Sequence, residues 1–371
     1  MSTERKKLLI IHSSDELYGS DRILLEVVEA LKQVWELTVW LPTDHQDGKQ
    51  RLFKELGQRG IEVFHIDMPI LRRALLTPRG ASRFLRLAPG MVRRLRQATP
   101  DRVYLMTGAC LLFAPLARLA GISHVTVHLQ EPWGAKEQLV LRQLARWTDH
   151  RIAISQTVAK STGLAMDSIN VVHNAVPRIE AARSAEPPFQ DTELPTYLVA
   201  SRWNGHKGHG TLLRAWELAG HPGKLFILGS APLNSDAVDV QELVEKYISV
   251  PRSVEVVGQV EDPTAWFDAV DCMILPTDTV EGCGLVAIEA FRHGKPALVS
   301  DSGGPAEVVV HRENGLIFPP QGVEELAQML MNTTKDQLRE WGARARIDYE
   351  RNYTPERYHA SIREELANAA S

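Results

Sequence analysis

The sequence contains few cysteines and no long apolar segment. Its three cysteines, Cys110, Cys272 and Cys283, have neither the spacing of a metal site nor that of a disulfide framework. This usage is typical of a reducing cytosol. No run approaches the roughly 20 apolar residues that cross a bilayer, and the run Leu8–Ile11 is too short for a signal peptide. We therefore expect a cytoplasmic protein whose contact with a membrane, if it has one, is peripheral.

The length and the charge distribution indicate two domains and an anionic partner. The chain has 371 residues, too many for one compact core. Its composition, 44% hydrophobic and 24% charged, is that of an ordinary globular protein. Residues 1–180 carry 25 Lys and Arg against 18 Asp and Glu, or +7, whereas residues 181–371 carry 17 against 28, or -11. The basic first half predicts contact with an anionic partner.

Short apolar runs alternate with amphipathic stretches along most of the chain, which predicts parallel doubly wound sheets. The pattern breaks once, where Pro187-Pro188 and several acids follow one another without periodicity. We therefore predict an α/β protein with two Rossmann-like domains. The expected parts are a first domain (1–178), a linker (179–195), a second domain (196–352) and a C-terminal helix (353–371) that begins after Tyr353-Thr354-Pro355. The predicted strands are Leu8–His12, Leu37–Leu41, Val63–Ile66, Val103–Met106, His124–His128, Ile152–Ile154, Ile169–Val172, Tyr197–Ala200, Leu225–Leu228, Val254–Val257, Cys272–Leu275, Ala297–Ser300 and Leu316–Phe318.

The segment Glu281–Glu289 carries the clearest chemical pattern. It follows the predicted strand Cys272–Leu275 and contains a glycine-rich turn that leads into a predicted helix, Leu285–His293. Backbone N–H groups and the positive end of a helix bind anions, while the two flanking carboxylates can accept hydrogen bonds from hydroxyl groups. A nucleotide sugar offers both a diphosphate and hydroxyl groups, so the segment predicts binding of such a molecule.

A second segment, Ser201–Gly210, lies between the predicted strand Tyr197–Ala200 and a predicted helix. It holds two cations, Arg202 and Lys207, which would stabilise the negative charge that develops on a departing diphosphate. Ligands of open parallel sheets bind at the carboxyl ends of strands, where both segments lie. In the first domain, Gly19 follows the first predicted strand and could let backbone N–H groups approach a phosphate.

These residues resemble the motifs of the retaining family-4 glycosyltransferases, which have the GT-B fold. The family's E-x7-E motif matches Glu281 and Glu289, and Gly282-Cys283-Gly284-Leu285 resembles its G-F-G-L turn, with Cys in place of Phe. Arg202 and Lys207 match the family's phosphate-binding pair in R-x4-K-G. The resemblance spans nearly the whole chain. It implies two Rossmann-like domains facing a cleft, with the last helix crossing back to the first domain.

The resemblance also implies a role for each matched residue. Glu289 is similar to the residue that accepts the ribose hydroxyls, and Glu281 to the one that contacts the sugar near the reacting centre. Arg202 and Lys207 would bind the diphosphate and act in catalysis. His128 matches a histidine near the donor sugar and the acceptor, and Glu131 would hold an acceptor hydroxyl. Where the family often has Gly-Gly, this chain has Tyr18-Gly19, so only Gly19 is expected to approach the donor.

Other enzyme classes fit the sequence less well. A glycosidase needs two carboxylates that face each other across a glycosidic bond, whereas Glu281 and Glu289 come from one turn and its helix. No G-x-S-x-G pattern indicates a serine hydrolase. The chain also lacks the Asp-x-Asp through which many transferases hold a diphosphate by a divalent metal. We therefore expect transfer without a metal or other cofactor.

A stretch between Met68 and Pro100 is basic and contains no acid. Apolar residues interleave its arginines, a pattern typical of a helix that lies on an anionic lipid surface, although a solvated helix packed on the sheet would read similarly. Nucleic acid is not expected, because the stretch lacks interleaved aromatics and the second half of the chain is acidic. The arginines are Arg72, Arg73, Arg79, Arg83, Arg86, Arg93, Arg94 and Arg96.

The sequence and the resemblance together predict a retaining, metal-independent hexosyltransferase. It would move a sugar from a nucleotide-diphosphate sugar, with UDP favoured over GDP, to a glycan or lipid-linked acceptor in bacterial surface polysaccharide assembly. The acceptor would bind the first domain and the donor the second, at the inner face of the cell membrane. A nucleotide-sugar epimerase on the same fold and a non-catalytic glycan- or nucleotide-binding subunit stay open as alternatives, and the oligomeric state is not predicted.

Overall fold

The computed structural model describes residues 5–17, 19–44, 50–72, 78–178, 189, 193–231 and 236–368. The chain divides into two compact units. Unit 1 contains Met1–Asn174 and Pro355–Ser371, and unit 2 contains Ala175–Thr354. Most of the predicted linker lies outside the described residues, since only 189 and 193–195 of it are described.

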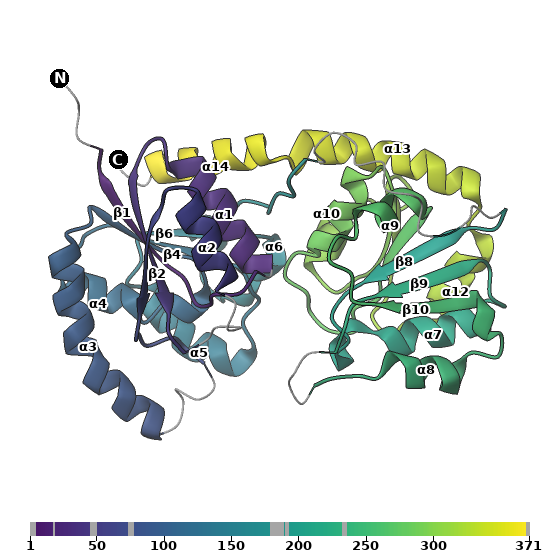
Figure 1. The fold of residues 1–371 in the computed structure, drawn as a ribbon, viewed down its shortest axis with the longest axis horizontal. Helices are drawn as coiled ribbons and strands as arrows, with labels where there is room; N and C mark the ends of the chain where they lie inside the picture. Colours follow the sequence, from purple (N-terminus) through teal and green to yellow (C-terminus); the bar gives the residue numbers. More distant parts are fainter. Residues whose placement is uncertain are drawn as a thin grey trace. The chain divides into compact units, whose positions relative to one another are not determined.

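Unit 1 is built on a parallel seven-stranded sheet with the order β3-β2-β1-β4-β5-β6-β7. Helices α1, α2 and α14 cover one face of this sheet, and α3, α4 and α5 lie on the other (Figure 1). Its strands are β1 (Lys7–Ile11), β2 (Glu36–Pro42), β3 (Glu62–Ile66), β4 (Arg102–Leu105), β5 (Val125–Leu129), β6 (His150–Ala153) and β7 (Asn170–Val171). Its helices are α1 (Gly19–Leu31), α2 (Arg51–Gln58), α3 (Pro78–Ala98), α4 (Phe113–Leu119), α5 (Ala135–Ala145), α6 (Gln156–Ser161) and α14 (Pro355–Asn368).

Unit 2 repeats this architecture with a parallel six-stranded sheet of order β10-β9-β8-β11-β12-β13. Its core packs Trp216, Tyr197 and Phe318 with aliphatic residues of the strands and helices. Its strands are β8 (Thr196–Ala200), β9 (Lys224–Leu228), β10 (Val254–Gly258), β11 (Cys272–Leu275), β12 (Ala297–Ser300) and β13 (Gly315–Phe318). Its helices are α7 (His209–Leu218), α8 (Val240–Tyr247), α9 (Thr264–Ala269), α10 (Leu285–Arg292), α11 (Gly304–Val308), α12 (Val323–Asn332) and α13 (Lys335–Asn352).

The predicted fold class is confirmed. Each of the thirteen predicted apolar runs coincides with a strand to within two residues at either end, and both sheets are parallel and doubly wound. In each sheet the direction of winding reverses once, between β1 and β4 in unit 1 and between β8 and β11 in unit 2. In open α/β sheets ligands bind outside the carboxyl ends of the strands at such a reversal. The fold therefore marks one candidate region in each unit.

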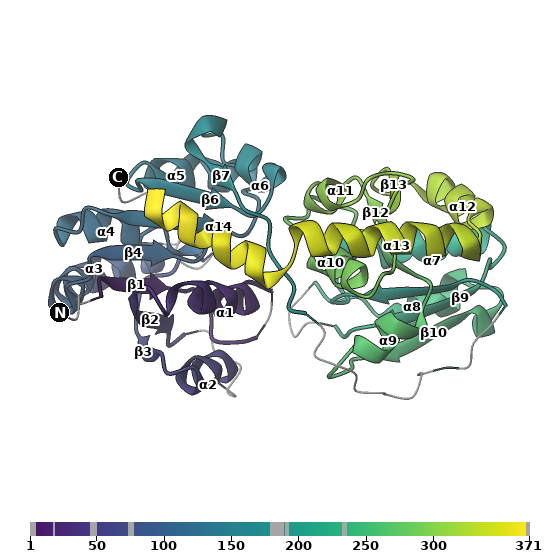
Figure 2. The same ribbon diagram turned by 90° about the horizontal axis from the view of Figure 1, so that it is seen from above.

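The C-terminal helices differ in the unit to which they belong. Helix α13 is part of unit 2, and α14 packs against α1 of unit 1 (Figure 2). Three buried side chains, Tyr358, Ile362 and Leu366, anchor α14. Its surface is also tied to the unit by hydrogen bonds from His359 to Glu26 at 2.8 Å and from His150 to Glu365 at 2.6 Å. The last helix thus returns to the first unit, as the fold prediction stated.

The borders of the units fall a few residues from the predicted domain borders. Residues 175–178 belong to unit 2 because Val176 is bonded to the end of α13: its N–H donates to the Tyr353 carbonyl at 3.1 Å, and its carbonyl accepts from the Tyr349 hydroxyl at 2.9 Å. Among the described helices, none is long and apolar enough to cross a bilayer.

Candidate active site

In unit 2, the loops that follow β8 and β11 are locked together. Gly208 has a φ of 70°, and a Cβ at this position would lie 1.7 Å from the Pro276 carbonyl oxygen. The Asp278 N–H donates to the His206 carbonyl at 2.9 Å, and the Thr211 hydroxyl donates to the Asp278 carboxylate at 3.0 Å. A glycine is therefore required at 208, and the loop that carries Arg202 and Lys207 is held beside the loop that leads to Glu281.

The ammonium group of Lys207 forms an ion pair with the Glu281 carboxylate. The two side chains are only 18% and 23% exposed. The structure thus brings together a residue predicted for the diphosphate and one predicted for the sugar. Arg202 lies exposed in the same loop, directly after β8. Because an ammonium group has three donors, Lys207 can keep its bond to Glu281 and still contact a phosphate oxygen.

The glycine-rich turn rests on the start of α11. Gly284 has a φ of 71°, and a Cβ there would lie 2.8 Å from Pro305. A Cβ on Gly304 would lie 2.2 Å from the Gly282 carbonyl oxygen. Two backbone hydrogen bonds join the same segments, from Glu281 N–H to the Ser302 carbonyl at 2.7 Å and from Gly304 N–H to the Glu281 carbonyl at 3.0 Å. Small residues on both sides therefore set the position of Glu281.

Glu289 is the fifth residue of α10, which begins directly after Gly284, and its side chain is half-buried. The first N–H groups of a helix have no intrahelical acceptor and favour an anion. Cys283 is buried, so its side chain fills space under the turn. Glu281 therefore precedes the amino end of α10, and Glu289 lies beyond its first turn.

The two histidines of the segment Ser201–Gly210 have different partners. His206 lies 3.4 Å from Asp236, while His209 is buried and its Nε2 lies 3.3 Å from the Ser201 hydroxyl. Burial lowers the pKa of His209 to about 4, and the nearby Lys207 charge acts in the same direction. The neutral, buried His209 ring therefore contacts the start of the loop Ser201–Gly210 through the Ser201 hydroxyl.

In unit 1, the corresponding region contains a buried polar cluster that the sequence did not single out. Asp21, near the start of α1, accepts from His12 Nε2 at 2.7 Å and from the Ser14 hydroxyl at 2.5 Å. This cluster fixes the loop after β1 against α1, whose first residue is Gly19. The available signal was the change from an apolar strand to His12, Ser14 and Asp21, but many turns of this kind have no such cluster.

The structure places His128 inside the sheet of unit 1. Its ring is fully buried, and its Nδ1 lies 3.0 Å from the Tyr104 hydroxyl. Burial lowers the pKa of His128 to about 3, so the ring is neutral at physiological pH. Its Nε2 has no hydrogen-bond partner among the described residues.

Glu131, two residues beyond β5, is exposed and borders a cavity of about 180 Å³. Trp133 and Leu71 give this cavity an apolar lining, and Arg72 and Lys136 add positive charge. The cavity lies at the carboxyl ends of β4 and β5, where a ligand of this sheet is expected.

In the structure, acidic residues from outside the predicted basic stretch pair with two of its arginines. Arg72 lies 3.0 Å from Asp44, and Arg83 lies 2.5 Å from Asp67 and 3.4 Å from Asp44. Arg96 donates to the Leu119 carbonyl at 2.7 Å. Four others, Arg79, Arg86, Arg93 and Arg94, have exposed side chains on α3, and Arg73 lies outside the described residues.

Residues 195–336 match the family model described as glycosyl transferases group 1. This range contains the loops after β8 and β11 and all of α10. This part of the chain is therefore similar to the group 1 glycosyltransferases. The matched range begins at the first strand of unit 2, so the family signal is carried by the unit that holds the Lys207–Glu281 pair.

Other similar proteins match a larger share of the chain. An exopolysaccharide phosphotransferase of Streptomyces coelicolor is 30% identical over 73% of the chain, but the chain spans only 29% of that relative's length. A GDP-mannose-dependent phosphatidylinositol monomannoside mannosyltransferase of Corynebacterium glutamicum is 25% identical, over 91% of both chains. The structure of Anabaena HepE in complex with UDP is similar in fold, with a TM-score of 0.80, 20% identity and coverage of 98% of this chain and 100% of HepE.

Proposed function

We propose that this protein transfers a sugar from a nucleotide-diphosphate sugar to a glycan or lipid-linked acceptor, with retention of the anomeric configuration. The observation that carries the proposal is the grouping of Lys207 with Glu281 beside the glycine turn at the winding reversal of unit 2. Cations and backbone N–H groups beside carboxylates suit a ligand that combines a diphosphate with hydroxyl groups.

In the proposed reaction, the acceptor hydroxyl attacks the anomeric carbon from the face that the diphosphate leaves. The bond between the anomeric carbon and the phosphate oxygen breaks, and the acceptor proton passes to the departing phosphate oxygen. Arg202 and Lys207 stabilise the charge that develops on the leaving group. Glu281 contacts the transferred sugar, and Glu289 accepts hydrogen bonds from the ribose hydroxyls. No metal or other cofactor takes part.

We propose UDP as the nucleotide of the donor and a bacterial surface polysaccharide as the destination of the sugar. Two of the similar proteins differ in the base of their nucleotide, since HepE was crystallised with UDP and the Corynebacterium relative is GDP-mannose-dependent. The Streptomyces relative is named for exopolysaccharide. The acceptor would bind unit 1, near Glu131 and the cavity that it borders.

We further propose that the protein is cytoplasmic and binds the inner face of the cell membrane through α3. The exposed side chains of Arg79, Arg86 and Arg93, together with Leu85, which is 71% exposed, support this placement. Basic and apolar side chains on one exposed helix are the combination that binds anionic lipid.

Product analysis separates the proposed transfer from its alternatives. Purified protein is incubated with UDP-glucose, UDP-galactose, UDP-N-acetylglucosamine or GDP-mannose, with and without a lipid extract as the acceptor source. Transfer predicts release of the nucleotide diphosphate, which increases when acceptor is added. An epimerase would change the sugar of the donor without releasing the nucleotide, and a non-catalytic subunit would leave every donor unchanged.

A further inference from the structure

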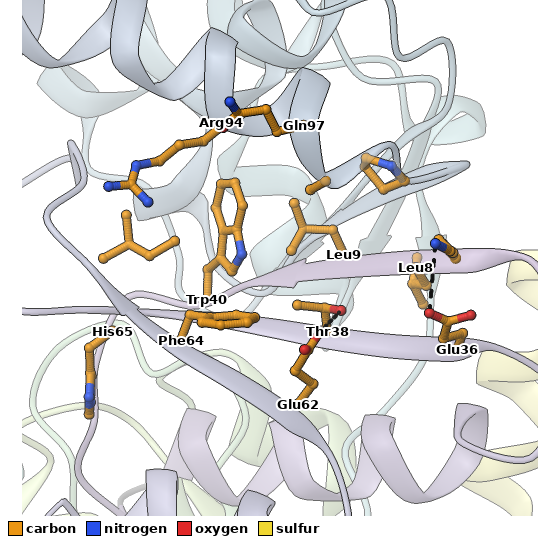
Figure 3. A pocket seen from close by; sticks show the side chains of 14 residues that line it. Leu8, Leu9, Glu36, Thr38, Trp40, Glu62, Phe64, His65, Arg94 and Gln97 are labelled. Atoms are coloured by element: carbon orange, nitrogen blue, oxygen red, sulfur yellow. Dashed lines mark hydrogen bonds and ion pairs between the residues drawn. The ribbon is translucent and has the colours of Figure 1, made fainter.

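A cavity of about 370 Å³ lies on the α3 side of the sheet of unit 1 (Figure 3), and none of the residues discussed as donor or acceptor ligands lines it. Its floor is formed by strands β1, β2 and β3, and α3 forms one wall. We call it the β2–β3 groove. Its volume is within the range of pockets that bind small molecules, about 300–1,000 Å³.

The groove follows from strand register. On this face Thr38 pairs with Glu62 and Trp40 pairs with Phe64, so two aromatic rings and two polar side chains form adjacent rows. β3 is one of the two edge strands of the sheet, and Phe64 is 45% exposed although its cross-strand partner Trp40 is only 4% exposed. The sheet therefore presents an aromatic side chain to solvent where α3 leaves its edge uncovered.

Polar groups surround this aromatic floor. The Thr38 hydroxyl donates to the Glu62 carboxylate at 3.1 Å, which fixes the orientation of Glu62. Arg94 and Gln97 reach the groove from α3, on the other side of Trp40 (Figure 3). No partner of Arg94 or Gln97 occurs among the described residues of the chain, so both side chains are available to a ligand.

This combination fits a sugar ring better than other ligands. The apolar C–H face of a hexose can pack on the exposed ring of Phe64, beside the edge of the buried Trp40 ring, which removes apolar surface from water. Its hydroxyl groups can donate to Glu62 and accept from Arg94 and Gln97. A phosphate or nucleotide would meet the carboxylates of Glu62 and Glu36, and a lipid chain would leave these polar groups buried without partners.

We propose that the β2–β3 groove is a second glycan-binding site, which holds a neutral oligosaccharide segment of the acceptor or product chain outside the active site. The proposal rests on the proposed function, because that function supplies a glycan as substrate. In this proposal Arg94 binds the glycan, whereas Arg79, Arg86 and Arg93 bind the membrane surface. Holding the chain at a distance from the reacting end raises the effective concentration of the acceptor.

The indole N–H signal of Trp40 in NMR spectra of the full-length protein tests the proposal, with the signal assigned by a Trp40→Phe variant. The probes are glucose, mannose and their linear hexasaccharides maltohexaose, cellohexaose and mannohexaose. We expect at least one hexasaccharide to shift the signal and to bind at least tenfold more tightly than its monosaccharide. Phe64→Ala and Glu62→Gln are each expected to weaken this binding at least tenfold. Met166→Ala is the matched control, since Met166 is 39% exposed in the same unit and lies outside the groove.

Several results would overturn the proposal. One is a Trp40 signal that none of these sugars shifts. A second is hexasaccharide binding that is as tight in Phe64→Ala as in the wild type. A third is self-association that Phe64→Ala abolishes, since it would assign the groove to a second copy of the chain. Measuring nucleotide diphosphate binding in the same variants distinguishes the proposed glycan site from the proposed active site. We expect Phe64→Ala and Glu62→Gln to bind them like the wild type. If the wild type binds no nucleotide diphosphate, the proposed active site is refuted but the proposed glycan site in the groove is not.

Discussion

The ion pair of Lys207 and Glu281 joins the residue proposed for the diphosphate to the residue proposed for the sugar. Both side chains are largely buried, and both loops are fixed by glycines that a larger residue could not replace. A preorganised charge of this kind can stabilise a leaving group without rearranging at the moment of reaction. Among single residues, Arg202 and Lys207 in the loop after β8 are therefore expected to have the largest catalytic effect.

Substitution of either cation tests that assignment. Lys207→Ala and Arg202→Ala are each expected to lower turnover of the donor by about 100-fold, the scale for one preorganised group. Lys207→Ala also leaves Glu281 without its ion-pair partner. Steady-state kinetics measures the effect, and Lys224→Ala in the same unit, which removes the ion pair with Glu255, is the control. Wild-type turnover in both variants would refute the role.

The buried His128 predicts a pH dependence of stability. Burial lowers its pKa to about 3, whereas the unfolded chain has an ordinary value of 6.5. The unfolded state therefore binds an extra proton between these values, and His128 destabilises the fold as pH falls from 6.5 towards 3. His128→Gln should reduce the pH dependence of the unfolding free energy across this window, measured by urea unfolding. An unchanged slope would contradict the assignment of a neutral ring.

Some residues of the site were predictable from the sequence and others were not. Lys207 and Glu281 lie 74 positions apart, but each follows an apolar run, and the sheet brings such loops together. The cluster of His12, Ser14 and Asp21 was missed, because nothing in its spacing separates it from an ordinary polar turn. The pairing of Arg83 with Asp67 was also missed, since a charge count within one stretch omits acids outside that stretch.

At the scale of elements, the apolar runs predicted the strands because buried parallel strands read as continuous hydrophobic segments. The register that places Trp40 opposite Phe64 could not be predicted, since it depends on how β3 pairs with β2. The break at Tyr353-Thr354-Pro355 predicted the end of α13, because the residue before a proline disfavours the helical conformation.

Helix α14 offers a test at this scale. Ile362 of α14 is fully buried within unit 1, so Ile362→Ala should destabilise the protein by about 2–5 kcal/mol through the cavity that it leaves. Thermal or urea unfolding measures the loss. The neighbouring Arg363→Ala changes an exposed side chain and should alter stability by less than about 0.5 kcal/mol. Equal stability of both variants would show that α14 does not anchor unit 1.

At the scale of the whole molecule, the basic first half predicts attraction to anionic lipid. Each arginine near such a surface can contribute roughly 1 kcal/mol. We expect the protein to sediment with vesicles of phosphatidylcholine and phosphatidylglycerol and to remain unbound with phosphatidylcholine alone. The triple variant Arg79→Gln, Arg86→Gln and Arg93→Gln should lose most of this binding. Equal binding to both kinds of vesicle, or to neither, would exclude an electrostatic interaction.

We propose that unit 2 binds a nucleotide diphosphate between its cations and its carboxylates. The most direct measurement is the unfolding midpoint of the full chain with UDP, GDP, ADP and dTDP, because a ligand that binds only the folded state raises it. We expect at least one of the four, with UDP favoured, to raise the midpoint of the wild type. Lys207→Ala and Glu289→Gln should each lose most of that shift. No shift with any of the four, or a full shift in both variants, would contradict the assignment of the donor site to these residues.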